Sequence, residues 1–395
     1  MTLRKYSAAK VSTTQKFSAS ANNFRAVARQ RVSVNILAAG EIPPPTPVYL
    51  WGWGWNFEGG LGLGDTTTRS SPTQVGTLSN WASLSKGAGV HMTAIKTDGT
   101  LWSWGGNLFG KLGLGNTTYY SSPKQVGVLT NWSNATQGDQ HTAVIKTDGT
   151  LWAWGNNEYG QLGLGNTGNY SSPKQIGALT NWASISGRAN YFLAIKTDGT
   201  LWSWGNNYNY NLGLGNTASR SSPVQIGAGT TWSTVSAGQG AFAIKTDGTL
   251  WAWGSNYFGN LGFGNTIDKT SVEQLGSDTN WYRISSGGAF AIAIKTNGTL
   301  WAWGINSGGV LGLGDATRRY SPVQVGALTN WAKIDMGSSG VSASIKTDGS
   351  LWTWGSNSFG GLGLGDTTNR SSPVQVGTRT AWANVFVASN TFAIG

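Results

Sequence analysis

The chain repeats one segment, which reads in one of its copies Thr150-Leu151-Trp152-Ala153-Trp154-Gly155-Asn156-Asn157 and then Leu162-Gly163-Leu164-Gly165-Asn166-Thr167. The Trp-Gly pair of this segment recurs at Trp53-Gly54, Trp104-Gly105, Trp154-Gly155, Trp204-Gly205, Trp253-Gly254, Trp303-Gly304 and Trp354-Gly355. Successive pairs are 49 to 51 residues apart, so no copy carries a large insertion. A fixed period of this length is the sequence signature of a repeat architecture.

Each copy contains four short segments that are typical of β-strands: Leu-Trp-x-Trp, Pro-x-Gln-Val, Trp-Ala-x-Ile and Ala-Ile-Lys. The Thr-Asp-Gly between Ala-Ile-Lys and the next Leu-Trp indicates a hairpin, because Gly accepts the positive φ of such a turn. A single four-stranded sheet cannot bury both of its faces, whereas sheets stacked radially around an axis bury them against each other. The sequence therefore predicts an all-β, seven-bladed β-propeller over residues 49–395.

The two ends of the repeated region predict how the ring closes. The first copy begins at Tyr49 without a preceding Ala-Ile-Lys strand, and the last copy ends inside that strand, at Phe392-Ala393-Ile394-Gly395. We expect residues 391–395 to pair with residues 49–54 and so to join the last copy to the first. An open solenoid would instead need polar capping repeats. The segment before Tyr49 is then expected to leave the ring beside the Thr-Asp-Gly turns.

The amino-acid composition excludes some chemistry and points to a packed aromatic core. The chain has no cysteine, so it has no disulfide and no thiolate metal ligand or nucleophile. Of its 22 Trp, all but Trp55 fall in the Leu-Trp-x-Trp strands or in the Asn-Trp-Ala type strands, at Trp81, Trp132, Trp182, Trp232, Trp281, Trp331 and Trp382. Large rings at one place in every copy are interpreted as packing between blades. A Trp-lined sugar site is the alternative.

Residues 1–48 differ from the rest of the chain in charge. They contain one acid, Glu41, and seven cations: Arg4, Lys5, Lys10, Lys16, Arg25, Arg29 and Arg31. The other 20 cations and 15 acids of the chain are nearly balanced. We interpret residues 1–48 as an extended basic arm with a Pro-rich spacer, and residues 31–37 alternate well enough for one strand that would add to a partner's sheet edge. Packing of the arm on its own propeller is the alternative.

The repeated residues resemble the regulator of chromosome condensation repeat. The shared pattern is Leu-Trp-x-Trp-Gly-x-Asn-x-x-Gly-x-Leu-Gly-Leu-Gly-(Asp/Asn)-Thr, then Ser-Pro-x-Gln-Val and Ile-Lys-Thr-Asp-Gly, over residues 49–395. The resemblance implies a seven-bladed propeller with a split closing blade. The best-known member of that family is an exchange factor for the small GTPase Ran that also binds nucleosomes. Its activity relies on a wedge-like insertion, for which the regular spacing of this chain leaves no room.

One ring of residues is the predicted ligand-facing surface of the propeller. It lies three residues before the recurring Pro position and varies between copies: Arg69, Tyr120, Tyr170, Arg220, Lys269, Arg319 and Arg370. Arg and Tyr are enriched at binding hot spots. Related repeats often place Arg here, so a structural role of this ring is the alternative.

Other repeated or rare polar residues have structural interpretations. The two histidines, His91 and His141, precede an apolar strand and are expected to pack in the core, and no metal site is predicted. The Asp and Asn residues after Leu-Gly-Leu-Gly are expected to form hydrogen bonds within their own turns. The Gly residues of that motif are expected where the backbone is crowded or needs a positive φ, and not to bind phosphate. The lysines of Ala-Ile-Lys are expected to form a solvated face beside the Asp of Thr-Asp-Gly.

These observations favour a structural, non-enzymatic protein without a cofactor. We expect the basic arm to bind protein subunits of a large assembly and the propeller to be displayed as a binding platform for a host-surface glycan or protein. Near-identical copies also look like propellers of bacteria and phages, so a phage virion component (capsid decoration, tail or fibre-associated) is the concrete prediction, with the virion as localisation and the cytoplasm as alternative. A nucleic-acid-binding, chromatin-binding or GTPase-regulating propeller is the other hypothesis. No apolar run is long enough to span a membrane.

Overall fold

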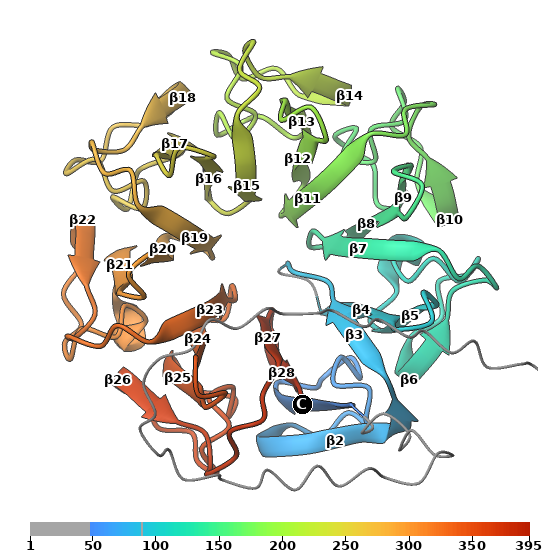
Figure 1. The fold of residues 1–395 in the computed structure, drawn as a ribbon. Helices are drawn as coiled ribbons and strands as arrows, with labels where there is room; N and C mark the ends of the chain where they lie inside the picture. Colours follow the sequence, from blue (N-terminus) through green and yellow to red (C-terminus); the bar gives the residue numbers. More distant parts are fainter. Residues whose placement is uncertain (1–47, 88–89) are drawn as a thin grey trace, which may run out of the picture. The chain divides into compact units, whose positions relative to one another are not determined.

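The structure is a computed structural model that describes residues 48–87 and 90–395. Within these residues the strands form seven antiparallel, four-stranded sheets arranged around a central axis (Figure 1). The predicted seven-bladed propeller is therefore confirmed. We number the blades from the sheet β27-β28-β1-β2, which is blade one, through β3–β6, which is blade two, to β23–β26, which is blade seven.

Two strands of each blade come from the Leu-Trp and the Pro-x-Gln segments. The Leu-Trp strands are β1 (Tyr49–Gly54), β5 (Leu101–Gly105), β9 (Leu151–Gly155), β13 (Leu201–Gly205), β17 (Leu250–Gly254), β21 (Leu300–Gly304) and β25 (Leu351–Gly355). The strands at the periphery are β2 (Arg69–Ser79), β6 (Tyr120–Gln125), β10 (Tyr170–Gln175), β14 (Arg220–Gln225), β18 (Lys269–Gln274), β22 (Arg319–Gln324) and β26 (Arg370–Gln375). Two short 3-10 turns, η1 (Leu108–Gly110) and η2 (Ser307–Gly309), follow Leu-Trp strands.

The other two strands of each blade lie on the axial side. The Ala-Ile-Lys segments form β4 (His91–Lys96), β8 (His141–Lys146), β12 (Tyr191–Lys196), β16 (Gly240–Lys245), β20 (Phe290–Lys295), β24 (Val341–Lys346) and β28 (Asn390–Ile394). The innermost strands are β3 (Trp81–Leu84), β7 (Trp132–Gln137), β11 (Trp182–Arg188), β15 (Trp232–Ser236), β19 (Trp281–Ser286), β23 (Trp331–Met336) and β27 (Asn384–Val387). Their ends converge on the axis (Figure 1).

Blade one is closed by strands from both ends of the repeated region. Strand β28 pairs with β1, from Leu50 opposite Ile394 to Gly54 opposite Asn390. This pairing confirms the predicted closure and gives the sheet order β2-β1-β28-β27. The carbonyl of Val48 accepts the amide of Asn80 at 2.8 Å, and Asn80 in turn accepts the amide of Thr97 at 2.9 Å. Residue 48 thus lies beside a Thr-Asp-Gly turn, as expected.

Every pair of adjacent blades shares one buried indole hydrogen bond. The Trp of each Trp-Gly pair donates from Nε1 to a carbonyl of the preceding blade at 2.8 to 3.0 Å: Trp104 to Gly60, Trp154 to Lys111, Trp204 to Gln161, Trp253 to Asn211, Trp303 to Asn260, Trp354 to Val310, and Trp53 to Gly361. The Leu-Gly-Leu-Gly loop approaches these indoles closely, since a Cβ on Gly363 would lie 2.7 Å from Nε1 of Trp53. Backbone crowding therefore explains this Gly.

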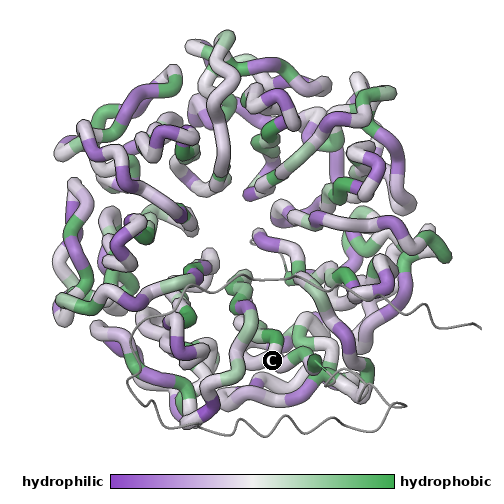
Figure 2. The backbone as a smooth tube through the Cα atoms, viewed as in Figure 1, coloured by the Kyte–Doolittle hydropathy of each residue, from purple (hydrophilic) through white to green (hydrophobic). Residues whose placement is uncertain are grey.

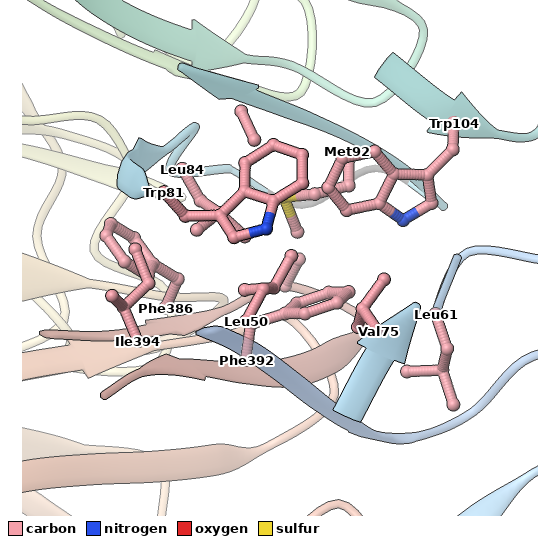
Figure 3. Close-up of a cluster of buried hydrophobic side chains, with 12 residues drawn as sticks. Leu50, Leu61, Val75, Trp81, Leu84, Met92, Trp104, Phe386, Phe392 and Ile394 are labelled. Atoms are coloured by element: carbon pink, nitrogen blue, oxygen red, sulfur yellow. The ribbon is translucent and has the colours of Figure 1, made fainter. Parts of the chain in front are cut away.

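The hydrophobic core lies between the blades. The cluster between blades one and two joins Leu50, Phe392 and Ile394 to Trp81 and Trp104 (Figure 3). Equivalent clusters fill the other interfaces, so hydrophobic segments recur in every sheet and are not gathered in one part of the ring (Figure 2). The interpretation of the repeated Trp residues as packing between blades is consistent with these contacts.

The lysines of the Ala-Ile-Lys strands do not form the solvated face that the sequence suggested. Lys146, Lys196, Lys295 and Lys346 are buried, and each ammonium lies over two Trp rings. For Lys196 the ammonium is 3.5 Å from the ring centroid of Trp202 and 4.8 Å from that of Trp182. Burial lowers the pKa of Lys196 below its ordinary value. The expectation was wrong because two indole rings lie beside each of these lysines. The aliphatic part of the lysine side chain packs on the rings, and the ammonium makes cation–π contacts with them.

Candidate functional site

The predicted ring of variable residues lies at one end of the propeller. Each of its members is the first residue of a peripheral strand and pairs with the Gly of a Trp-Gly pair, as Tyr120 does with Gly105 and Arg220 with Gly205. The same Gly pairs on its other side with the first residue of an Ala-Ile-Lys strand, such as Tyr191 opposite Gly205. We call this end, where the Leu-Trp strands finish, the loop face.

Three arginines of the ring are bound to carboxylates of their own loops. Arg69, Arg319 and Arg370 form ion pairs of 2.6 Å with Asp65, Asp315 and Asp366. Asp65 also accepts the amide of Thr67 at 2.9 Å. This amide, together with Arg69, holds the pKa of Asp65 below its usual range. The Asp residues of the motif thus bond their own turn, as expected, and the three arginines brace that turn.

The other four ring members have different partners. Lys269 pairs with Glu273 at 2.7 Å. The hydroxyls of Tyr120 and Tyr170 accept weak bonds from Asn116 and Asn166. Arg220 donates to the carbonyls of Ala218 and Ser219 at 3.2 and 3.3 Å, and no carboxylate of the described residues lies within ion-pair distance of it. The ring is therefore half-buried and partly self-neutralised, and Arg220 is its one arginine without an ion pair among the described residues.

A second set of side chains, which were not predicted as site residues, projects from the loops of the same face. We call it the apolar rim, and it consists of Trp55, Phe57, Leu108, Phe109, Tyr159, Tyr208, Tyr257, Phe258 and Phe359. Phe57 and Tyr257 are each 71% exposed. Trp55, the one Trp outside the repeated positions, stacks on Phe57 with ring centroids 6.1 Å apart and also contacts Phe359 of blade seven at 6.2 Å.

The apolar rim adjoins the predicted ring. The loop that carries Phe57 rests on blade two, because a Cβ on Gly59 would lie 2.7 Å from the Cα of Ser121, the residue after Tyr120. In blade six the guanidinium of Arg318 lies 5.4 Å from the ring centroid of Phe258. Rim and ring together form one surface that mixes aromatic side chains with Arg and Tyr, the composition of protein-binding hot spots.

The loop face also contains a pocket at the axis, of about 420 Å³, lined by loops from blades three to seven. Its wall includes Arg188, Tyr191, Tyr208, Asp139 and several Asn and Gln side chains. The Tyr191 hydroxyl donates to the Gly238 carbonyl at 2.9 Å, and burial raises its pKa to about 12. Sequence reasoning missed Arg188, although a comparison of the copies shows Gly or Ala at this position in the other blades: Gly87, Gly138, Gly238, Gly287, Gly337 and Ala388.

Both histidines lie in the core. His91 Nε2 is 3.0 Å from the Thr142 hydroxyl, and the ring of His141 meets the ring of Phe192 edge-on with centroids 4.7 Å apart. Burial lowers the pKa of His141 to about 3, so this imidazole is neutral at pH 7. Their packing role, expected from the sequence, agrees with these contacts. In the described part of the chain no group of three or more His, Cys, Asp or Glu residues is placed to hold a metal ion.

The predicted partner-binding cations of the arm, Arg4, Lys5, Lys10, Lys16, Arg25, Arg29 and Arg31, lie outside the described residues. Their role as an anchor remains a prediction from sequence. Among residues 48–87 and 90–395, the structure has no helix that is long and apolar enough to cross a membrane.

The repeats and the closed ring define a propeller that presents loops for binding, and comparison with known families makes the assignment specific. The regulator of chromosome condensation (RCC1) repeat matches residues 49–94, 98–145, 148–195, 198–242, 247–294, 297–343 and 348–390. The chain belongs to the RCC1 repeat family. RCC1-type propellers serve as platforms for protein interaction.

Individual relatives share parts of this organisation. The chain is 41% identical to the ultraviolet-B receptor UVR8 of Arabidopsis thaliana over 69 residues, which are 17% of this chain and only 16% of that receptor. Human WBSCR16 has the same fold, with a TM-score of 0.78 and 20% identity, over 88% of this chain and 98% of that one. Prp20p of Saccharomyces cerevisiae, whose structure is described together with its binding to Gsp1p and histones, also has this fold. Its TM-score is 0.77 and its sequence identity 19%, over 88% of this chain and 91% of that one.

Proposed function

We propose that the loop face docks a partner protein and that the chain acts by binding and not by catalysing a reaction. The observation that carries this proposal is the apolar rim, whose aromatic side chains are exposed, whereas the Trp of every Trp-Gly pair is fully buried between blades. Large exposed apolar groups rimmed by polar residues mark interaction sites on soluble proteins. The residue types of the apolar rim differ from blade to blade, whereas those of the core repeat. The loop face is therefore not uniform around the ring, as specific recognition of one partner requires.

The charges of the same face support a protein partner with an acidic patch. Arg220 has no ion pair among the described residues, and Arg318 adds a cation beside Phe258. Arg next to exposed aromatic rings is enriched at the centre of protein interfaces. An acidic protein surface would therefore be steered to this end of the propeller and would bury the rim.

The finer form of the proposal concerns the assembly. Residues 1–48, which carry most of the excess positive charge, anchor the chain to protein subunits of a large particle, and the propeller is displayed with its loop face free. The near-identical copies favour a phage virion as this particle, where the chain would be a capsid decoration, a tail component or a fibre-associated protein. In that setting a host-surface glycan or protein is the class of molecule that the displayed face would meet.

A matched pair of surface variants tests the docking proposal. The residues Phe57, Tyr208 and Tyr257 occupy a loop position at which blades six and seven carry Ser307 and Ser358, so their replacement by Ser retains a side chain that the fold already accepts. We expect Phe57→Ser, Tyr208→Ser and Tyr257→Ser together to weaken binding to the native partner by about tenfold or more, as loss of interface aromatics does. The control is Val128→Ser, an exposed apolar residue at the opposite end beside the Thr-Asp-Gly turns.

The partner for this test is identified by site-specific photocrosslinking in the native source. A photoreactive residue at Tyr257 should capture one defined protein that the same residue at Val128 does not capture, and the affinity of that purified protein is then measured for each variant. Equal capture from both positions, or unchanged affinity of the triple variant, would show that the loop face is not the docking surface.

A second experiment tests the arm separately. Deletion of residues 1–47 should leave the propeller folded and should abolish incorporation of the chain into the particle, and mass spectrometry of purified particles measures this incorporation. Normal incorporation of the truncated chain would exclude the arm as the anchor.

The binding of Prp20p to Gsp1p favours a second candidate, a propeller that regulates a small GTPase. An exchange assay separates the two functions. Faster release of labelled GDP from a Ran-type GTPase in the presence of this chain would support regulation, whereas binding without faster release supports a platform.

A further inference from the structure

Arg188 occupies a position at the axis where the other blades have no side chain beyond a methyl group. It is the last residue of β11, and the equivalent residues are Gly in blades two, three, five, six and seven and Ala in blade one. In those blades the neighbouring backbone fills the space, since a Cβ on Gly138 would lie 2.5 Å from the carbonyl oxygen of Ala189, and one on Gly337 2.0 Å from that of Ala388. Only blade four therefore sends a long cationic side chain toward the pocket.

Arg188 is mostly buried, and its guanidinium has no partner among the described residues. The residue is 7% exposed, and its side chain forms no hydrogen bond or ion pair with any described residue. Burial lowers the pKa of Arg188, yet a guanidinium stays protonated in proteins. A buried charge without an ion pair is strongly unfavourable. The little surface that remains to Arg188 borders the pocket of about 420 Å³ and a small axial cavity of about 30 Å³.

Two carboxylates, Asp139 and Asp335, lie near enough to Arg188 to attract its charge, but neither forms an ion pair or a hydrogen bond with it. Asp335 is buried at the axis, where it accepts the Ser285 hydroxyl at 3.1 Å and the Val387 amide at 2.9 Å. It thereby replaces the hydroxyl that links inner strands in other blades, as Ser186 Oγ does by accepting the amide of Ala237. Asp139 is exposed on the pocket wall and forms no ion pair with Arg188.

The rest of the pocket wall has the chemistry of a saccharide site. The side-chain amides of Asn190 and Asn209 line the pocket and form no hydrogen bond with the described residues. Tyr208 presents a 64% exposed ring that is held edge-on by Tyr159 at 5.7 Å. Free amides suit hydroxyl groups, and an exposed aromatic face suits the apolar face of a sugar ring. The pocket volume fits one or two rings of this kind.

We propose that this pocket, which we call the axial pocket, binds an acidic saccharide, with the sugar carboxylate paired to Arg188, its hydroxyls bonded to Asn190 and Asn209, and its ring placed against Tyr208. A carboxylate and a guanidinium form a bidentate pair, which satisfies the buried charge. Asp139 on the wall disfavours a second negative charge, so a monoanionic uronic acid suits the site better than a dianionic phosphate. This site is separate from the docking surface of the apolar rim except at Tyr208.

The full chain provides a direct test with simple probes. Glucuronate, galacturonate, methyl glucoside and inorganic phosphate are compared by ligand-observed NMR and by thermal unfolding. We expect a uronate to bind and to raise the Tm of the native chain, and methyl glucoside to bind at least about tenfold more weakly, since it lacks the charge-assisted pair. Phosphate binding as tight as that of both uronates would overturn the assignment to a saccharide.

Variants distinguish a binding role of Arg188 from a structural one. Arg188→Gly introduces the residue found at this position in other blades. We expect this variant not to bind uronate, and its Tm without ligand to be equal to or higher than that of the native chain. The control Arg379→Gly, which removes an exposed cation from the opposite end of the propeller, should leave uronate binding unchanged. Asp139→Asn should tighten uronate binding, because it removes a negative charge from the wall.

The competing explanation is that water in the small axial cavity joins Arg188 to Asp335. In that case Arg188→Gly and Asp335→Ser would each lower the Tm, their effects would be strongly non-additive, and no uronate would bind. Such a result would overturn the proposal. Uronate binding that persists in Arg188→Gly would overturn it as well.

Discussion

The indole Nε1 of Trp53 donates a hydrogen bond of 2.9 Å to the carbonyl of Gly361, although 308 residues separate the two along the chain. This bond is the counterpart, across the closing interface, of the indole bonds that link the other neighbouring blades. Blade one, which is assembled from both ends of the repeated region, is therefore joined to blade seven by the same contact as every other pair of blades. The interface between blades seven and one therefore uses the same repeated residues as the other interfaces.

We expect Trp53→Phe to lower the free energy of unfolding by at least about 1 kcal/mol, the net contribution of a typical hydrogen bond, with a further cost because a smaller ring occupies a fully buried site. The Gly361 carbonyl retains a second donor, the hydroxyl of Thr391 at 2.8 Å. The matched variant Trp204→Phe should cost more, because no second donor from the described residues replaces the indole at the Gln161 carbonyl. Urea denaturation of both variants measures the difference, and an equal or larger loss for Trp53→Phe would contradict it.

Alkaline pH should stabilise the propeller through Lys111. Its ammonium is buried, donates to the side-chain oxygen of Gln140 at 2.8 Å, and has its pKa lowered from 10.5 to about 8, mainly by burial. The cost of burying the charge is fully present below pH 8. Between pH 8 and 10.5 the unfolded chain keeps a proton that the folded chain releases, so stability rises with pH, with a slope of up to about 1.4 kcal/mol per pH unit.

The matched variant for this effect is Lys111→Gln, because Gln161 occupies the same position in the next copy. We expect it to raise the free energy of unfolding at pH 7.5 and to flatten the rise between pH 8 and 10.5. The measurement is urea denaturation at several pH values. A slope that persists in the variant would assign the effect to other groups.

Acid should destabilise the propeller through His141. Its pKa is lowered from 6.5 to about 3, mainly by burial and further by the charge of Lys111, and its ring nitrogens have no hydrogen-bond partner among the described residues. The stability that this neutral ring contributes is fully present above pH 6.5 and is lost as the pH falls toward 3, since the unfolded chain then takes up a proton. His141→Phe, which introduces the residue found at Phe290 in another copy, should reduce the fall in Tm between pH 7 and 4. An unchanged fall would place the acid sensitivity elsewhere.

The pairing of Arg69 with Asp65 predicts a small, salt-sensitive contribution to stability. Asp65→Asn introduces the residue of four other copies and retains the bond to the Thr67 amide, so it removes only the ion pair. The expected cost is about 0.2–1 kcal/mol at low salt and less at high salt. A double-mutant cycle with Arg69→Ala gives the coupling energy. A coupling that does not decrease with added salt would show that the contact is not mainly electrostatic.

The sequence predicted the candidate site only in part. It placed the ring from Arg69 to Arg370 at equivalent positions, but its use as a ligand-facing surface remains a prediction, and the structure adds that three of its arginines brace their own loops. The apolar rim was missed because Trp55 stands alone and its other members fall at two neighbouring loop positions that vary in residue type. Arg188 was missed because its significance depends on what the other copies carry at the axis.

The sequence by itself determined the number of blades, the strands within each blade and the closing pair of strands, because a 50-residue period and a split last copy leave one way to bury every sheet face. Only the tertiary structure decided where the lysines of the Ala-Ile-Lys strands pack and what surrounds Arg188. Those environments are formed by side chains and loops of several blades that lie together in the folded ring. The alternation of residues along one strand does not predict which of these side chains come into contact. The axial pocket, lined by loops from blades three to seven, exists only once the ring has closed.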